Sequence, residues 1–269
     1  MTLDRLFVGA VCDREPSFSR SQTAPTKRDV IDIMDGTGYS EVLELILKQK
    51  IDQYKSIVFD CDGVVLDSNL LKTEAYFRTA KTLGATDVQA QALVDYHVRL
   101  GGISRYHKFD YYLREILNQP ATNEAIQILL DEFGRELEVG LMECDIADGL
   151  EVLRTATSNA KWAILSGGDQ QEIRTLFGKR NLTPLFEGGL FGSPDNKDEV
   201  LAREVANGNI QFPALFLGDS KYDYEAATRA GLDFIFLSDW TEVADWQEFC
   251  AANQIEVLGG IGDLLNELC

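Results

Sequence analysis

The sequence is poor in basic residues. Lys and Arg total 25 of 269 residues, against 44 Asp and Glu, which gives a formal net charge of −19. Nucleic acids and anionic membrane surfaces bind proteins through basic patches, so we expect neither as a partner of this chain. The sequence also lacks a long uncharged apolar run, so it predicts no transmembrane helix.

Cysteine is scarce as well. The five cysteines are scattered, at Cys12, Cys61, Cys144, Cys250 and Cys269, with no CxxC pair. This number and spacing predict neither a disulfide framework nor a zinc site. The first residues are charged and precede only a short apolar stretch, which does not fit a secretory signal. A reducing cytoplasm is therefore the expected location.

The first 50 residues carry no strand-like run. Residues 1 to about 35 are polar, with breakers and no sustained period, which is typical of a flexible segment. Residues 40–50, SEVLELILKQK, show the apolar spacing of a helix, with Ser40 as a candidate N-cap. We expect residues 1–50 to form an N-terminal extension that is partly flexible.

Most of the remaining chain alternates between strand-like and helical patterns. Apolar strand-like runs cover residues 57–59, 163–166, 186–193, 214–220, 233–238 and 255–260. Helical patterns separate the later runs, and this alternation predicts an α/β fold, a Rossmann-like parallel sheet wrapped by helices. We assign this core to residues 51–69 and 148–269.

The segment between the first two strands reads as helical throughout. Four stretches show amphipathic helical spacing, and Gly84, Gly101, Gly102 and Pro120 punctuate them. We therefore expect residues 70–147 to form an inserted, all-helical cap domain.

Residues that can do chemistry follow the strands of the predicted sheet. They are Asp60 and Asp62, then Ser166, Gly167 and Gly168, then Lys197 at a helix start, then Asp219 and Asp223. Ligands of an open α/β sheet bind at the carboxyl ends of its strands, so we expect these side chains to share one rim.

The acidic residues on this rim fit phosphoryl transfer. A carboxylate such as Asp60 can attack phosphorus and form an aspartyl-phosphate. Asp60 and Asp219 can supply the oxygen ligands that Mg²⁺ prefers, and the cation neutralises charge on the phosphoryl group. Asp62, two residues after Asp60, is placed to protonate the leaving oxygen and then to deprotonate water.

The other rim residues fit phosphate binding. Ser166 and the amides of Gly167 and Gly168 are expected where a helix begins and can donate to phosphate oxygens, while Lys197 adds positive charge. Each motif alone also has a structural interpretation, such as a turn, a solvated lysine or an acid that caps the next helix. All four motifs in this order are hard to explain in that way.

The ordered motifs DCDGVVLDS, ILSGG, Lys197 in GSPDNKDEVL and GDSKYDYEAATRAG resemble those of the haloacid dehalogenase superfamily, over about residues 55–240. The helical insert resembles the branch with a helical cap, which includes phosphoglycolate phosphatases and β-phosphoglucomutases. The resemblance implies that Asp60 is the nucleophile, Asp62 the acid/base, and Ser166 and Lys197 phosphate ligands. It implies Mg²⁺ ligands at Asp60, the carbonyl of Asp62, Asp219 and Asp223.

The motifs depart from the family pattern in informative ways. Dehalogenases of the superfamily lack the second acid of the first motif, so Asp62 favours phosphoryl chemistry, while Asn69 stands where Glu is common. We expect a Mg²⁺-dependent phosphatase of a small phosphate ester, of the phosphoglycolate or sugar phosphate type. A phosphomutase is the alternative enzyme. A phospho-Asp signalling receiver is disfavoured by motif order and by the cap, and the oligomeric state stays open.

A polar loop, GGISRYHKF, interrupts the helical segment at residues 101–109. It is either a connection with solvated basic residues or a substrate loop in which Arg105 binds a second anionic group, such as a carboxylate. We expect His97 and His107 to be structural or surface residues, because the first motif already supplies the acid/base.

Overall fold

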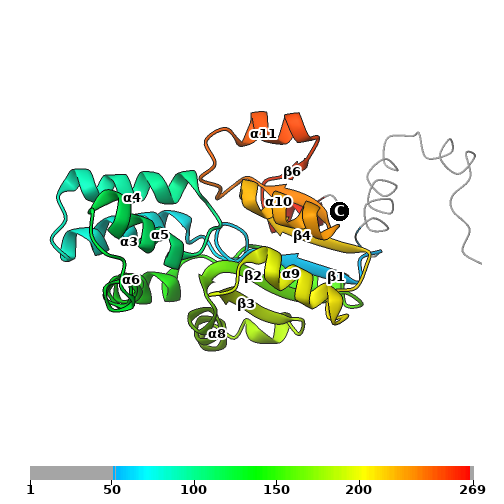
Figure 1. Ribbon diagram of the computed structural model, residues 1–269. Helices are drawn as coiled ribbons and strands as arrows, with labels where there is room; N and C mark the ends of the chain where they lie inside the picture. Colours follow the sequence, from blue (N-terminus) through cyan, green and yellow to red (C-terminus); the bar gives the residue numbers. More distant parts are fainter. Residues whose placement is uncertain (1–50, 52, 267–269) are drawn as a thin grey trace, which may run out of the picture. The chain divides into compact units, whose positions relative to one another are not determined.

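The computed structural model of the protein describes residues 51 and 53–266 (Figure 1). Its centre is a six-stranded, all-parallel sheet in the order β3-β2-β1-β4-β5-β6. The strands are β1 (Ser56–Phe59), β2 (Lys161–Asp169), β3 (Gly189–Ser193), β4 (Ala214–Gly218), β5 (Asp233–Leu237) and β6 (Glu256–Leu258). This arrangement confirms the predicted Rossmann-like fold. The expected N-terminal extension, with its helix at residues 40–50, lies outside the described residues.

Strand β1 lies in the middle of the sheet and is buried on both faces. Phe59 pairs with Ile164 of β2 on one side and with Leu217 of β4 on the other. Ile57 and Phe59 belong to one hydrophobic cluster, whereas Val58 belongs to a second cluster with residues of α9 and α10. This alternation follows from the two-residue period of a strand, and it anchors the residues that follow β1.

Helices cover the sheet. They are α7 (Leu150–Ala156), α8 (Gln170–Lys179), α9 (Lys197–Ala206), α10 (Lys221–Ala230), α11 (Trp246–Asn253) and α12 (Ile261–Asn266), with a 3₁₀ turn at Thr183–Leu185. Helices α9 and α10 start with capping boxes, in which Asn196 and Ser220 cap the first backbone amides. These caps fix the starts of the two helices, and with them Lys197 as the first residue of α9 and Asp223 as the third residue of α10.

A helical segment separates β1 from β2. It contains α3 (Asn69–Thr82), α4 (Asp87–Arg99), α5 (Arg105–Tyr111), a π-helix (Tyr112–Ile116) and α6 (Asn123–Glu143), and none of its described residues forms a strand. We call residues 69–143 the helical insert. Its helices pack on one another to one side of the sheet (Figure 1), around buried rings such as Tyr76 and Phe133, whose centroids are 4.3 Å apart.

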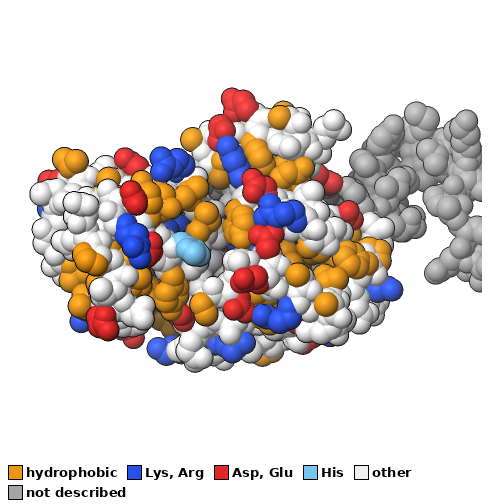
Figure 2. All heavy atoms as spheres, viewed as in Figure 1, with side chains coloured by type: hydrophobic (Ala, Val, Ile, Leu, Met, Phe, Trp, Pro, Cys, Tyr) orange, Lys and Arg blue, Asp and Glu red, His pale blue; other side chains and the backbone are white. Residues whose placement is uncertain are grey.

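Charge on the visible surface is mixed. Figure 2 shows Lys and Arg side chains scattered among acidic ones over both the insert and the sheet, without a continuous basic patch on this face. None of the helices in the described part of the chain is long and apolar enough to cross a membrane. Most of the basic residues that bear on the site below are instead buried, among them Arg105, Lys108 and Lys197.

Candidate active site

The strand-end acids lie in the interior of the protein. Asp60 directly follows β1 and Asp219 directly follows β4, and these two strands are neighbours in the sheet. Asp223 lies one helical turn further, in the first turn of α10. All three side chains are buried, with relative exposures of 0–5%. The sheet order therefore brings Asp60 close to Asp219, which lies 159 residues later in the sequence.

Lys197 lies between two of these carboxylates. Its Nζ is 3.0 Å from Oδ1 of Asp60 and also contacts the carboxylate of Asp223. Burial alone would lower the pKa of Lys197, but Asp223 and Asp60 outweigh it and raise that pKa. The structure thus places Lys197 inside the site and not on the surface, which its sequence context alone had left open.

Asp223 has two functions in the local structure. Its carboxylate accepts a hydrogen bond of 2.6 Å from the Ser220 hydroxyl and completes the capping box of α10. The same carboxylate contacts Lys197. The helix-cap and binding-site interpretations of the GDSxxD motif are therefore compatible.

Asp60, Asp219 and Asp223 form a cluster that fits a metal ion. Each offers a carboxylate oxygen, and these oxygens lie within 4.8 Å of one another. Burial and the neighbouring carboxylates raise the pKa of Asp60 and of Asp219, because Lys197 supplies only one positive charge. A hard divalent cation such as Mg²⁺ matches both the oxygen donors and the missing charge.

Asn69, the first residue of α3, supports the cluster from the insert side. Its amide donates hydrogen bonds of 2.7 Å to Oδ2 of Asp219 and 2.8 Å to the carbonyl of Trp240. Gly63 is required beneath it, because its φ is +78° and a Cβ there would collide with the Asp219 carboxylate and the Asn69 amide. Asn69, which stands where Glu is common in the motif, thus holds the carboxylate of Asp219.

Asp62 points to a different set of partners. The Ser68 hydroxyl donates to its Oδ1 at 2.6 Å, the Ser166 hydroxyl donates to its Oδ2 at 3.2 Å, and Lys72 pairs with it. Burial acts to raise the pKa of Asp62, but Lys72 and Ser68 outweigh it and lower that pKa to about 2. Its carboxylate is outside the cluster of three found among the described residues.

Ser166, Gly167 and Gly168 lie within strand β2, not at a helix start as the sequence had suggested. The pairing of β2 with β3 is interrupted after Leu165 and resumes at Asp169 opposite Ser193, so the strand continues through these residues. Ser166 accepts a hydrogen bond of 2.9 Å from the Gly168 amide. Gly167 has no room for a side chain, because a Cβ would meet the carbonyl of Gly102 in the insert.

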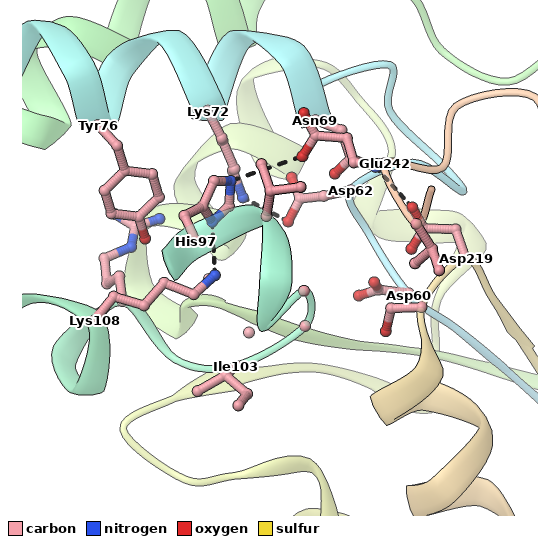
Figure 3. Close-up of a pocket in the computed structure, with 18 of the residues that line it drawn as sticks. Asp60, Asp62, Asn69, Lys72, Tyr76, His97, Ile103, Lys108, Asp219 and Glu242 are labelled. Atoms are coloured by element: carbon pink, nitrogen blue, oxygen red, sulfur yellow. Dashed lines mark hydrogen bonds and ion pairs between the residues drawn. The ribbon is translucent and has the colours of Figure 1, made fainter. Parts of the chain in front are cut away.

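A small cavity lies between the insert and these strand ends (Figure 3). It offers about 60 Å³ to water-sized molecules. Asp60, Asp62 and Asp219 line it from the sheet, together with Gly167 and Gly168. Ser166 and Lys197 instead line a neighbouring cavity that also borders the insert. The predicted site residues thus surround one region, linked by the Ser166–Asp62 and Lys197–Asp60 contacts.

The insert contributes cavity residues that the sequence did not single out as site residues. They are Lys72, Tyr76, His97 and Lys108. Arg105 also lines the cavity, but its guanidinium donates to both carboxylate oxygens of Glu172, at 2.7 and 2.9 Å. The solvated-loop interpretation is wrong for Arg105 and Lys108, whose exposures are 4% and 3%. Their three-residue spacing places both on one helix face, but the spacing does not show whether that face is buried.

Comparisons with known proteins agree with this geometry. A family model described as haloacid dehalogenase-like hydrolase matches residues 54–231. The 6-phosphogluconate phosphatase of Escherichia coli (strain K12) is 24% identical over 197 residues, covering 70% of this chain and 85% of the relative. The phosphorylated carbohydrates phosphatase of Thermotoga maritima is 24% identical over 189 residues, covering 68% and 84%. The crystal structure of a predicted phosphatase from Clostridium acetobutylicum shares the fold, with a TM-score of 0.61 at 18% identity over 80% of this chain and 97% of that one.

Proposed function

The chain belongs to the haloacid dehalogenase-like hydrolases, and we propose that it is a Mg²⁺-dependent phosphatase of a small phosphorylated metabolite, of the sugar phosphate or phosphoglycolate type. The observation that carries the proposal is the buried group of Asp60, Asp219 and Asp223, two of them in contact with Lys197, with Asp62 two residues from Asp60. Both curated relatives are named as phosphatases, one of them for phosphorylated carbohydrates, which supports this reaction.

In the proposed reaction Asp60 is the nucleophile. Oδ1 of Asp60 accepts a hydrogen bond of 2.8 Å from the Cys61 amide and lies 3.0 Å from Nζ of Lys197, which fixes the orientation of the carboxylate. A carboxylate oxygen attacks phosphorus, the ester P–O bond breaks, and the alcohol leaves with a proton. Water then hydrolyses the aspartyl-phosphate and releases inorganic phosphate.

Asp60, Asp219 and Asp223, with the carbonyl of Asp62, would hold the Mg²⁺. When bound, the cation neutralises negative charge on the transferred group. Lys197, Ser166 and the amide of Gly167 would bind phosphoryl oxygens. Their placement around Asp60 and Asp62 supports these assignments, because each lies in or beside the same cavity region.

Asp62 would serve as the acid/base. As the ionised carboxylate that Lys72 and Ser68 favour, it is ready to take a proton from the attacking water. In the preceding step it acts as the acid, so it must take up a proton when the substrate binds and pass that proton to the leaving alcohol. We propose that residues 70–147 act as a cap that excludes bulk water during both steps, because insert and sheet line the cavity together.

The experiment is a hydrolysis assay of the full-length protein. A panel of phosphorylated metabolites is incubated with Mg²⁺, and inorganic phosphate release is measured. We expect release from at least one sugar or hydroxy acid phosphate. Conversion between isomers without phosphate release would support the phosphomutase alternative, and no reaction with any member would contradict both.

A further inference from the structure

Lys108 is a buried cation without an acidic partner. Its exposure is 3%, and it forms no ion pair with any carboxylate in the described part of the chain. Its hydrogen-bond partner is a neutral ring nitrogen, Nδ1 of His97, at 2.7 Å. An ammonium group removed from water without a countercharge is costly, so such groups are rare unless a ligand completes them.

His97 presents an unsatisfied group beside Lys108. Its Nε2 is buried without a hydrogen-bond partner, and the nearest carboxylate oxygen, of Glu242, is 3.8 Å away. Because Lys108 donates to Nδ1, the proton of a neutral His97 lies on Nε2. Lys108 and His97 both line the cavity of the proposed active site. A lysine without an ion-pair partner and a ring N–H without an acceptor therefore line one wall of the cavity.

The other cations of the cavity are already paired. Lys72 forms an ion pair with Asp62, and Arg105 forms an ion pair with Glu172. Among the described cavity residues, Lys108 is thus the cation that still lacks an anion. This distinguishes it from Arg105, for which a second-anion role stays a prediction.

The position of Lys108 suits the leaving group of a substrate. Figure 3 shows Lys108, His97 and Tyr76 on one side of the cavity and Asp60 and Asp219 on the other. A phosphoryl group at Asp60 would direct the rest of the ester towards the insert. Nζ of Lys108 and Nε2 of His97 offer N–H donors to the two oxygens of a carboxylate.

We propose that Lys108, with His97 beside it, binds a carboxylate on the leaving-group side of the substrate. The preferred substrates are then phosphate esters of hydroxy acids, a conclusion that rests on the proposed phosphatase function. Lys108 determines specificity and takes no part in the bond-breaking step.

Binding to a full-length Asp60→Asn protein tests this without turnover. Titration calorimetry with Mg²⁺ compares matched esters with and without a carboxylate: 2-phosphoglycolate with 2-hydroxyethyl phosphate, 3-phosphoglycerate with glycerol 3-phosphate, and 6-phosphogluconate with glucitol 6-phosphate. We expect the acid to bind about 10- to 100-fold more tightly in at least one pair, the scale of a charged hydrogen bond. Fructose 1,6-bisphosphate tests a second phosphate in place of the carboxylate.

Added substitutions assign the preference to Lys108. Lys108→Met should remove it and Lys108→Arg should retain part of it. Lys81→Met is the control, since Lys81 is on α3 and pairs with Asp87 outside the cavity. The proposal would be overturned if both esters of every pair bound equally tightly, or if no ester with a carboxylate bound. It would also be overturned if the bisphosphate alone bound more tightly, or if the preference survived Lys108→Met. If the wild-type protein in those cases still hydrolyses phosphate esters that lack a carboxylate, the phosphatase function stands.

Discussion

Lys108 is held in the protein interior at a cost to stability. Burial, and then the charge of Lys72, lower the pKa of Lys108 to about 7, so its charged form is disfavoured in the free protein. Lys197 is equally buried, yet its two carboxylate neighbours raise its pKa. Side chains that bind ligands often carry this kind of cost, because their partner is absent until the ligand arrives.

The first prediction concerns the stability of Lys108→Met. Methionine has a similar length and no charge, so removing the unpaired ammonium should raise the free energy of unfolding by about 1–2 kcal/mol, or a few degrees in Tm. Thermal unfolding without substrate measures this. Lys197→Met should have the opposite sign, because it leaves Asp60 and Asp223 without their cation. A loss of stability in Lys108→Met would indicate a structural role.

The second prediction concerns pH. Only the protonated Lys108 attracts a carboxylate, so affinity for acidic esters should fall as pH rises above about 7, by up to tenfold per unit. The affinity for phosphate esters of the same length without a carboxylate should not fall in this way. The affinity of the Lys108→Met protein for the acidic esters should not fall either. Calorimetry from pH 6 to 9, on the Asp60→Asn background, measures it. A parallel pH dependence for both esters would contradict the assignment.

The charged or titratable groups that surround Lys108 are Lys72, Asp62, His97, Arg105, Glu242 and Tyr76.

Some site residues could be predicted from the sequence, whereas others could not. Asp60 and Asp219 could be predicted, because an apolar run followed by an acid marks a strand end, and parallel strands end on one rim. Lys108 could not, because whether a helical lysine is solvated or buried depends on what packs on it. Here Tyr76 and His97, from two other helices, do so.

Among the secondary-structure elements, α5 and α8 are connected by a partly buried ion pair. Arg105 begins α5 in the insert, and Glu172 is in the first turn of α8 beside the sheet. The guanidinium also lies 4.9 Å from the centre of the Phe133 ring. The pair therefore connects the insert to the sheet across the cavity.

The third prediction is that Arg105→Ala weakens this connection without changing specificity. Loss of the buried Arg105 guanidinium leaves the Glu172 carboxylate without its positive partner. We expect kcat/KM to fall by a similar factor, about tenfold, for phosphate esters with and without a carboxylate. Glu172→Gln should act in the same direction. Steady-state kinetics on a matched ester pair measures both. A selective loss for the acidic ester would instead make Arg105 the group that binds the second anion.

Elements could be predicted well where pattern and length agree. The apolar runs at β1, β4 and β5 and the long helices α4 and α6 were found in the sequence because their period is unambiguous. The end of β2 was not, because Ser-Gly-Gly favours a turn and only the pairing of Asp169 with Ser193 extends the strand. Helix α7 is seven residues long, too short for its period to stand out.

For the whole molecule, the acidic composition extends into the interior of the site. With a net charge of −19, gathering three of the carboxylates in one buried cluster is unfavourable. Alternating strands and helices could predict the sheet and its acidic rim. They could not predict that the insert closes the cavity with its own cations, because that depends on packing between segments distant in sequence.

The fourth prediction is that Mg²⁺ stabilises the full-length protein in the absence of substrate. A ligand that binds only the folded state at about 100 times its Kd adds about 2.7 kcal/mol, so the thermal midpoint should rise by several degrees and return on addition of EDTA. Asp219→Asn should lose most of the shift, since it removes one carboxylate of the cluster. An unchanged midpoint at millimolar Mg²⁺ would contradict the metal site.

The most direct measurement is phosphate release by Asp60→Asn beside the wild-type protein, with Mg²⁺ and the best ester of the panel. The amide keeps the size of the side chain but is a poor nucleophile, so turnover should fall by about 1,000-fold or more while the unfolding midpoint stays close to that of the wild type. A folded Asp60→Asn protein that retains a tenth of the wild-type rate would contradict the proposal that Asp60 attacks phosphorus.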